Sequence, residues 1–437
     1  MKKPRLQAGI DISKNKFDLC LLTSEGDILV RHRVFSNTRS GYQGLRDVLL
    51  EAWQAGDFAG IDIGGESTGP YWMPLFLQMQ ADSVLAAYDF HIYLLNARHV
   101  YWFKKGAAEA EKTDAKDSFF IAEKLRTQNN KQPWSFDPEW LRLRFYTRYR
   151  FHLGQQRTRL KNAFWATMFL WCNLYAPRQP FADGLGACGR MLIRTYPDWQ
   201  RLQEMSSEAL GAQLAECSRR RLSDPTGQAE QIQQIIQESF PVPPALTQVL
   251  HHLLTLHLDH LAFIEQQIRQ VERLIKIEVD THHPEVKCLM STQGIGLVLA
   301  AGIASEIGNL SRFFAGEKWD RRKQRFRRKN LRDVEDAVSK YAGLWWPRKE
   351  SGNFRAEDRR LNKQGNAYLR YYLVEAADKL RQYLPEYRAY YERKYREVKT
   401  HQHKRALVLT ARKSVGLFVG LLHRKEAYRS PEERLNN

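Results

Sequence analysis

The first 130 residues alternate short apolar runs with helix-like segments, and an aspartate interrupts the first apolar run. Asp11 lies in Gly9-Ile10-Asp11-Ile12-Ser13, within a run that is typical of a buried strand. A carboxylate is costly to desolvate in such a place unless a cation or hydrogen-bond donors compensate it. The alternation predicts an α/β domain whose first strand carries a charged site.

The elements of this region follow from composition and periodicity. Apolar runs rich in strand-forming residues predict strands at 8–22, 28–35, 58–63, 84–88 and 92–95. A hairpin turn at 24–27 is expected to join the first two of them. Amphipathic segments predict helices at 40–54, 70–80 and 109–126. Ser40 is the expected N-cap of the first helix.

Three further carboxylates stand where they can join Asp11. Glu66 follows the apolar run at 58–63, while Asp114 and Asp117 are three residues apart and share one helix face. Asp62 also lies in an apolar run, but Glu66 is preferred because it follows the strand end behind two flexible glycines. Converging carboxylates suit Mg²⁺, and two such ions can clamp both oxygens of a phosphoryl displacement. The alternative for each acid alone is a solvated side chain.

Charge is distributed unevenly along the chain. The formal net charge is +19, yet residues 1–135 carry 17 basic and 16 acidic side chains. A near-neutral acidic module joined to a strongly basic remainder favours a nucleic-acid partner over a membrane surface. The five cysteines show no metal-site or redox spacing, and no run of about 18 apolar residues is present. We therefore expect a cytoplasmic protein with no membrane partner.

Two long helices are expected in the middle of the chain. The first runs from Pro138 to about Tyr175 and interleaves aromatic residues with cations, which favours contact with unpaired RNA over an ordinary surface helix. Its candidate nucleic-acid contacts are Arg142, Arg144, Arg148, Arg150, Arg157, Arg159 and Lys161. The second, at 246–279, has a coiled-coil seam at Leu261, Ile264, Ile268, Val271 and Ile275. Its partner is either the first helix or a second copy of the chain.

The C-terminal third holds several further candidates. Gly294 and Gly296 open an apolar helix at 297–307 and can expose backbone N–H groups to a phosphate, although a tight turn explains them equally. The basic run that follows is expected to contact a phosphate backbone or to remain disordered until it does, and includes Arg325, Arg327 and Arg328. Ser351 lies in a polar loop between Lys349 and Arg355, where a hydroxyl can attack a phosphodiester. By chemistry alone this is a weak signal.

The order of motifs is more specific than any one of them. Gly-Ile-Asp-Ile-Ser, Gly-Glu-Ser-Thr-Gly at 65–69 and Lys-Thr-Asp-Ala-Lys-Asp at 112–117 are followed by Gly-Ile-Gly, Arg-Phe, Tyr-Ala-Gly-Leu, Ser-Gly and Lys-Gln-Gly-Asn-x₂-Leu-Arg. In this order the chain resembles the DEDD transposases of insertion-sequence family 110, over about 5–165 and 285–380. It departs from them at Gln293, where members usually have proline, and at 316–338, which looks like an insertion.

The resemblance implies a fold and an assembly. An α/β, RNase H-like (RuvC-like) nuclease domain is expected at 1–132, a helical coiled-coil region for RNA binding and dimerisation at 133–284, and a mostly helical transposase domain with a helix-hairpin-helix-like element at 285–437. Homodimers are expected to assemble into tetramers, with one subunit's acids joined to another's serine. A bacterial, nucleoid-associated location follows.

The resemblance also implies a chemistry. Asp11, Glu66, Asp114 and Asp117 would bind Mg²⁺, with Mn²⁺ as the alternative ion, and Ser351 would form a transient 5′-phosphoserine linkage. A structured bridge RNA would pair with donor and target DNA, and Lys363 would contact nucleic acid. Two alternatives stay open: a metal-dependent junction endonuclease that uses water, and a binding protein with a decayed nuclease domain. The complete set of four acids argues against the second.

Overall fold

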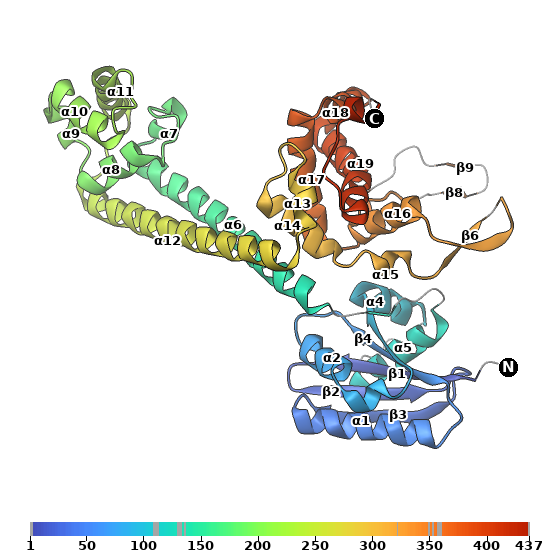
Figure 1. The fold of residues 1–437 in the computed structure, drawn as a ribbon. Coiled ribbons are helices and arrows are strands. Elements are labelled where there is room, and N and C mark those ends of the chain that lie inside the picture. The colour runs from blue at the N-terminus through green and yellow to red at the C-terminus, as the bar shows by residue number, and fades with distance from the viewer. Residues whose placement is uncertain are drawn as a thin grey trace. The chain divides into compact units, whose positions relative to one another are not determined.

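The computed structural model describes residues 3–435 except 108–112, 129–132, 135–136, 321, 348–349, 352–353 and 356–360. Backbone contacts divide the chain into two compact units that alternate along the sequence (Figure 1). The first comprises Met1–Leu141, Ile307–Arg370 and Val408–Arg424, and the second comprises Arg142–Glu306, Tyr371–Leu407 and Lys425–Asn437. Each is described by itself.

A mixed five-stranded sheet forms the N-terminal part of the first unit. Its strands, in the order β3-β2-β1-β4-β5, are β1 (Arg5–Ile12), β2 (Lys16–Leu22), β3 (Ile28–Ser36), β4 (Gly60–Glu66) and β5 (Phe90–Leu95). The strands β1, β2 and β3 pair antiparallel, whereas β1, β4 and β5 run parallel. The predicted α/β class of this region is confirmed.

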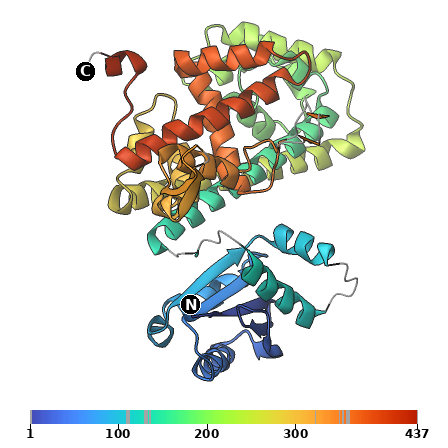
Figure 2. The same cartoon turned by 90° about the vertical axis from the view of Figure 1, so that its right-hand side faces the viewer.

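Helices cover both faces of the sheet (Figure 2). The helices α1 (Arg39–Gln54) and α2 (Trp72–Gln80) pack apolar side chains such as Leu45 and Phe76 against one face. The helix α5 (Asp114–Thr127) lies on the other face, where Ile121 and Leu125 join a core with β5 and α4 (Ala97–Gly106). The sheet is therefore largely apolar on both sides, although the carboxylates of Asp18 and Asp62 are buried within it.

Three details differ from the sequence-based expectations. The run at 8–22 is two strands, because Ser13 turns the chain by donating its hydroxyl and amide to the Lys16 carbonyl. The N-cap of α1 is Thr38, whose hydroxyl accepts the Gly41 amide at 3.1 Å. The run at 84–88 is the helical turn α3 (Ser83–Ala86), since Asp82 caps it by accepting from Val84. Residues 109–112 of the expected helix lie outside the described residues.

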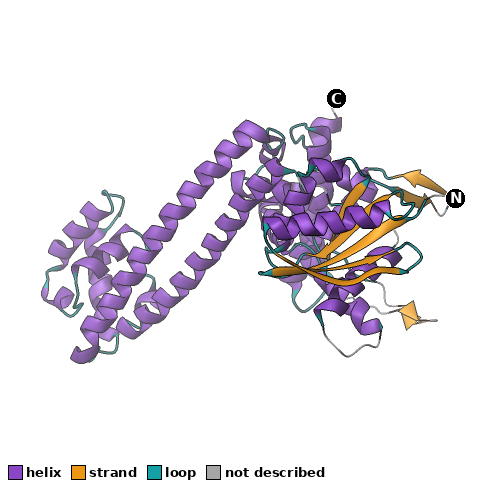
Figure 3. Cartoon of the chain, turned by 90° about the horizontal axis from the view of Figure 1, so that it is seen from below, coloured by secondary structure: helices purple, strands orange, loops and turns teal. Residues whose placement is uncertain are grey.

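The second unit is built on two long helices, α6 (Pro138–Trp171) and α12 (Pro244–His282), which lie side by side (Figure 3). Arg142 Nε is 3.0 Å from Glu278 Oε1, while the Thr167 hydroxyl is 3.4 Å from His257 Nε2, so the pair is antiparallel. The predicted seam of α12 is buried from Leu261 to Ile275. The partner of this seam is therefore α6 of the same chain and not a second copy of α12.

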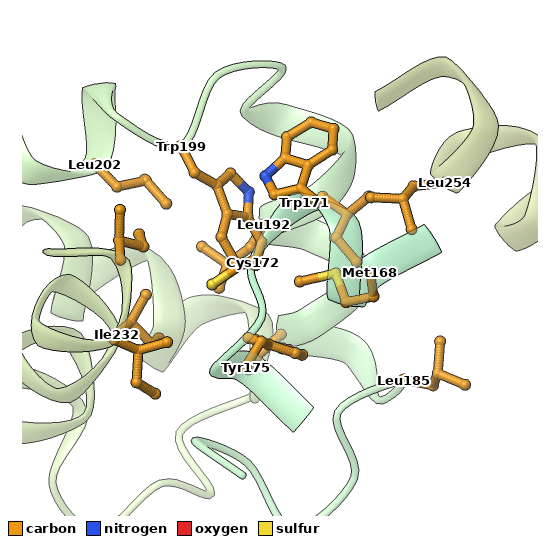
Figure 4. Packing of buried hydrophobic residues seen from close by; sticks show 14 of the residues in the cluster. Met168, Trp171, Cys172, Tyr175, Leu185, Leu192, Trp199, Leu202, Ile232 and Leu254 are labelled. Atoms are coloured by element: carbon orange, nitrogen blue, oxygen red, sulfur yellow. The ribbon is translucent and has the colours of Figure 1, made fainter. Parts of the chain in front are cut away.

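Five short helices form a cap at one end of this pair. They are α7 (Tyr175–Arg178), α8 (Ala187–Thr195), α9 (Arg201–Glu204), α10 (Ser207–Cys217) and α11 (Pro225–Glu238). Trp171, Tyr175 and Trp199 centre its core and meet edge to face, with the Tyr175 and Trp199 ring centroids 5.4 Å apart (Figure 4). The cap holds α6 and α12 together where the helical pair ends.

At the other end of the pair, α14 (Leu297–Ile307) and α17 (Ala367–Tyr383) pack against α6. Glu306 of α14 is fully buried and accepts two hydrogen bonds from Arg148, at 2.6 and 2.9 Å. The hydroxyl of Tyr372 donates to the Thr147 carbonyl at 2.8 Å. Gly302 permits this approach, because a Cβ there would lie 2.5 Å from the Tyr372 ring. The remaining helices of this region are α13 (Val286–Met290), α18 (Pro385–Arg396) and α20 (Pro431–Leu435).

The rest of the first unit consists of short elements and part of one long helix. The elements are α15 (Ser311–Phe314), β6 (Glu317–Asp320), β7 (Arg325–Arg328), α16 (Leu331–Tyr341), β8 (Glu350–Ser351) and β9 (Phe354–Arg355), with α19 (Gln402–Arg424). By length and composition α19 alone among the described helices is apolar enough to cross a membrane. More than half of the apolar stretch of α19 is buried inside the protein, and Arg412 pairs with Asp336 of α16. These contacts are those of a core helix.

Candidate active site

Two glycines allow α5 to press against the sheet. A Cβ on Gly9 of β1 would lie 2.3 Å from the backbone of Ala122, and one on Gly64 of β4 would lie 3.2 Å from Leu125. Thr113 caps α5 by accepting the Lys116 amide. This close packing directs the first turn of α5, with Asp114 and Asp117, toward the carboxyl ends of β1 and β4. Acids are also favoured at a helix N-terminus by its dipole.

Two of the four predicted acids contact one ammonium group, and a third lies within its electrostatic field. Lys104 Nζ of α4 is 2.8 Å from Asp117 Oδ1 and 3.5 Å from Glu66 Oε1. Burial, with the charges of Asp117, Glu66 and Asp114, raises the pKa of Asp11 to about 6, although Lys104 lowers it. Asp11 therefore lies within the field of the other three carboxylates.

The fourth acid, Asp114, is paired with a lysine of β2. Lys16 Nζ is 2.6 Å from Asp114 Oδ2 and 3.2 Å from Asp18 Oδ2. The hydrogen bonds that the Lys16 ammonium donates to Asp114 and Asp18 raise the pKa of Lys16. Asp18 is 2% exposed and stands opposite Asp11 in the antiparallel register. It is a fifth acid at the site, which the sequence-based set lacks.

Glu66 is oriented by the residues that follow it. The Ser67 amide and hydroxyl both donate to the Leu95 carbonyl, at 3.0 and 3.2 Å, so the end of β4 stays joined to β5. The Thr68 hydroxyl donates to Glu66 Oε2 at 3.3 Å. Asp62 is instead paired with Arg5 at 2.8 Å. Glu66 thus lies beside Asp117 at the end of β4 whereas Asp62 is paired elsewhere, and the choice of Glu66 as the site acid stays a prediction.

The donor set fits a divalent cation. Carboxylate oxygens are the ligands that Mg²⁺ and Mn²⁺ prefer, and the site already holds one positive charge, the Lys104 ammonium between Glu66 and Asp117. Across the described residues no group of three His, Cys, Asp or Glu side chains is arranged to hold a metal ion. Lys104 would have to give way for Glu66 and Asp117 to share an ion.

Ser351 lies on a hairpin whose base is fixed. Its backbone pairs with Phe354 between β8 and β9, and the segment is closed at its base by an antiparallel bridge between Trp345 and Asn362. The Asn362 amide donates to the Trp345 carbonyl at 2.9 Å. The Ser351 side chain and Lys349 lie outside the described part of the structure.

The motifs around this hairpin hold its base. The Asn366 amide donates to the Tyr341 carbonyl at 2.6 Å, while Arg370 Nη1 donates to the carbonyls of Ala342 and Lys363 at 3.0 and 3.1 Å. Gly365 fits because a Cβ there would lie 2.5 Å from the Tyr341 carbonyl oxygen. The Lys363 side chain itself is exposed.

The candidate nucleic-acid contacts on α6 fall into two groups. The four nearest its start have partners within the second unit: Arg142 with Glu278, Arg144 with the Ser305 carbonyl, Arg148 with Glu306 and Arg150 with Glu272. The other three, Arg157, Arg159 and Lys161, make no ion pair with any described residue. Nucleic-acid contact by either group stays a prediction.

The remaining candidates are two glycines and three arginines. Gly294 has a φ of +86° and a Cβ there would lie 2.5 Å from the Tyr383 ring, whereas Gly296 has open space around it. The first glycine is thus required by a tight turn between α13 and α14, and the second is not. Arg325 and Arg328 are exposed on β7, while Arg327 is paired with Asp333.

Comparison with known families gives two matches. Residues 8–169 match the DEDD transposase profile of the IS110 group, and residues 328–392 match the transposase profile of the IS116/IS110/IS902 family. Together the two matches span more than half of the 437 residues. No curated protein matches the chain.

The α/β domain with its acidic site, together with these matches, defines a DNA transposase. All four acids, from Asp11 to Asp117, fall within the first match. The chain belongs to the IS110 family of transposases, as its ordered motifs predicted.

Proposed function

We propose that this transposase is an RNA-guided DNA recombinase that cuts and rejoins DNA through a transient phosphoserine at Ser351, and that its α/β domain is RNase H-like. The observation that carries the proposal is the convergence of Asp11, Glu66 and Asp117 on one cation, with Asp114 held beside them by Lys16. A bound Mg²⁺ ion would supply charge stabilisation at the scissile phosphate.

The proposed reaction conserves a phosphodiester at each step. The Ser351 oxygen attacks phosphorus and gives up its proton, the bond to the DNA 3′ oxygen breaks, and that oxygen takes a proton. A 3′-hydroxyl of another strand then attacks the serine ester and restores Ser351. No ATP or water is consumed.

A second copy of the chain is a proposed partner, and the exposed side of α12 supports it. Besides its buried seam, the helix carries an exposed apolar row at intervals that are built from steps of three and four residues. Its members are Leu246, Val249, Leu253, Leu256, Phe263, Leu274 and Ile277. Soluble helices rarely expose such a row unless a partner covers it. A second α12 would bury it in a coiled coil. The cations Arg157, Arg159 and Lys161, which make no ion pair with any residue that the structure describes, support RNA as a further partner.

The test uses covalent capture on nicked DNA, with the full-length protein and the RNA that co-purifies with it. Wild type and Ser311→Ala, which removes an exposed serine of α15, should form protein–DNA adducts. Ser351→Ala and Asp11→Asn should form none, while both retain the co-purifying RNA. Adducts that persist in Ser351→Ala would remove the serine from the mechanism. Cleavage without any adduct in the wild-type protein would favour the hydrolytic endonuclease instead.

A further inference from the structure

The hairpin formed by β6 and β7 is strongly basic and has no role in the acidic site described above. Residues 317–329 carry eight basic and two acidic side chains. The sequence left open whether this segment is ordered, and its described residues form two paired strands. Residues 317–327 also lie outside both family matches. Most of the hairpin therefore lies outside the segments by which the family is matched.

Its base is fixed by one buried acid. Asp333, at the start of α16, accepts hydrogen bonds from Lys318 at 2.6 Å and from Arg327 at 2.5 Å, one from each strand. It also accepts the Asn330 amide at 2.9 Å, while its own amide donates to Asn330 Oδ1, which completes a capping box. Lys318 and Arg327 stand opposite each other in the register. The hairpin face that carries Lys318 and Arg327 therefore anchors the hairpin to α16.

The opposite face presents two aromatic rings to solvent. Trp319 and Phe326 form the next cross-strand pair, and alternation places them on the side away from Asp333. Their ring centroids are 5.0 Å apart at 67°, and they are 43% and 63% exposed. Large rings in this position have no role in a core. They are held in a fixed geometry without being buried.

Exposed cations flank the two rings along the hairpin sequence. Arg322, Lys323, Arg325 and Arg328 are exposed and make no ion pair with any described residue. The Asp320 carboxylate is occupied at the turn, where it accepts the Arg322 and Lys323 amides at 3.0 and 3.2 Å. The chemistry that matches a rigid aromatic pair within four free cations is a polyanion with exposed planar bases. A paired duplex hides its base faces, so the rings select unpaired nucleotides.

We propose that the β6–β7 hairpin binds an unpaired stretch of nucleic acid, stacking bases on Trp319 and Phe326 while the flanking cations hold the phosphates. The proposal rests on the proposed function only in taking nucleic acid as the partner, and it needs neither the metal site nor Ser351. A loop of the guide RNA and a displaced DNA strand share this chemistry, and separate probes distinguish them.

The experiment measures binding of full-length protein to fluorescent 20-nucleotide single strands of DNA and of RNA, and to a duplex, in EDTA. The double variant Trp319→Ala/Phe326→Ala should bind at least one single strand about 5- to 100-fold more weakly, with duplex binding changed by less than about twofold. The matched control, Phe145→Ala/Tyr149→Ala, removes two similarly exposed aromatic residues from α6. Because α6 is itself a predicted RNA contact, that variant reports on α6, and the inert control is Phe240→Ala, which removes an aromatic ring that is 81% exposed between α11 and α12 and should leave single-strand binding unchanged.

A second measurement does not depend on a variant. Light-induced crosslinking of wild-type protein to strands containing 5-bromouracil should yield adducts on the peptide that holds Trp319 or Phe326. Unchanged single-strand affinity in the double variant, an equal loss for duplex and single strand, or crosslinks only elsewhere would each overturn the proposal. A change in self-association alone would assign the rings to a protein contact. Adduct formation through Ser351 is scored separately, so its failure does not affect this result.

Discussion

Lys104 Nζ lies 2.8 Å from Asp117 Oδ1, and the same ammonium reaches Glu66. One helix, α4, thus supplies the positive charge that lets acids from α5 and β4 approach each other. A buried acid cluster of this kind is stable only with such a counter-charge. The lysine and a divalent ion would serve the same electrostatic purpose, so their effects on stability should be interdependent.

Replacing Lys104 by methionine should increase the dependence of stability on divalent ions. Without the ammonium, the acids repel each other in EDTA and the melting temperature should fall by a few degrees; Mg²⁺ should then raise it by more than in wild type. Differential scanning fluorimetry across a Mg²⁺ titration measures both. Lys105→Met is the control, because Lys105 lies over the Trp102 ring and has no acid partner among the described residues. Equal Mg²⁺ responses in all three proteins would contradict the interdependence.

The Asp11 carboxyl should make the metal-free protein less stable as pH rises. Its folded pKa of about 6 is above the unfolded value of 3.8, so the folded state binds the proton more tightly. Stability from this group is present below about pH 4 and is lost as pH rises to about 6. In EDTA at pH 8, Asp11→Asn should melt above wild type, and the difference should shrink toward pH 4. Asp57→Asn, at an exposed surface pair, should show no such trend.

Adding one methyl group at Gly9 should disrupt the site from beneath. Because a Cβ would lie 2.3 Å from the Ala122 backbone, Gly9→Ala should move α5 away from β1 and cost about 1–3 kcal/mol or more of unfolding free energy. Asp114 and Asp117 would move with α5, so the rate of DNA cleavage should fall by more than the loss of folded protein explains. Urea unfolding and cleavage assays measure the two effects. Gly106→Ala, where nothing lies within 4 Å, should fold and cleave like wild type.

A negative charge in the exposed row of α12 should weaken self-association. Leu256→Glu and Phe263→Glu would each have to bury a carboxylate in the proposed coiled coil, which is strongly unfavourable. Sedimentation velocity should show a shift from dimer toward monomer. Ala262→Glu places the same charge on the same helix outside the row and should leave the dimer intact. A wild-type protein that sediments as a monomer at micromolar concentration would contradict the proposed contact.

Sequence reasoning located the acids but not the groups that hold them. Asp11 is recognisable because it interrupts an apolar run, and Glu66 because it follows one. Both signals can be read from the neighbouring residues in the sequence. Asp18 and Lys104 give no local signal, since their roles arise from strand register and from a helix that packs across the sheet. For the same reason Arg148 looked like a surface cation, although its partner Glu306 is 158 residues away. Ser351 as nucleophile stays a prediction.

The backbone bridge between Trp345 and Asn362 limits how far the proposed nucleophile can travel. Ser351 follows Trp345 by six residues, and even a fully extended chain of that length spans at most about 20 Å. Any phosphate it attacks must be brought within that radius of the bridge. To reach a phosphate beyond that radius, the serine would have to be carried there together with the bridge and the elements that hold it.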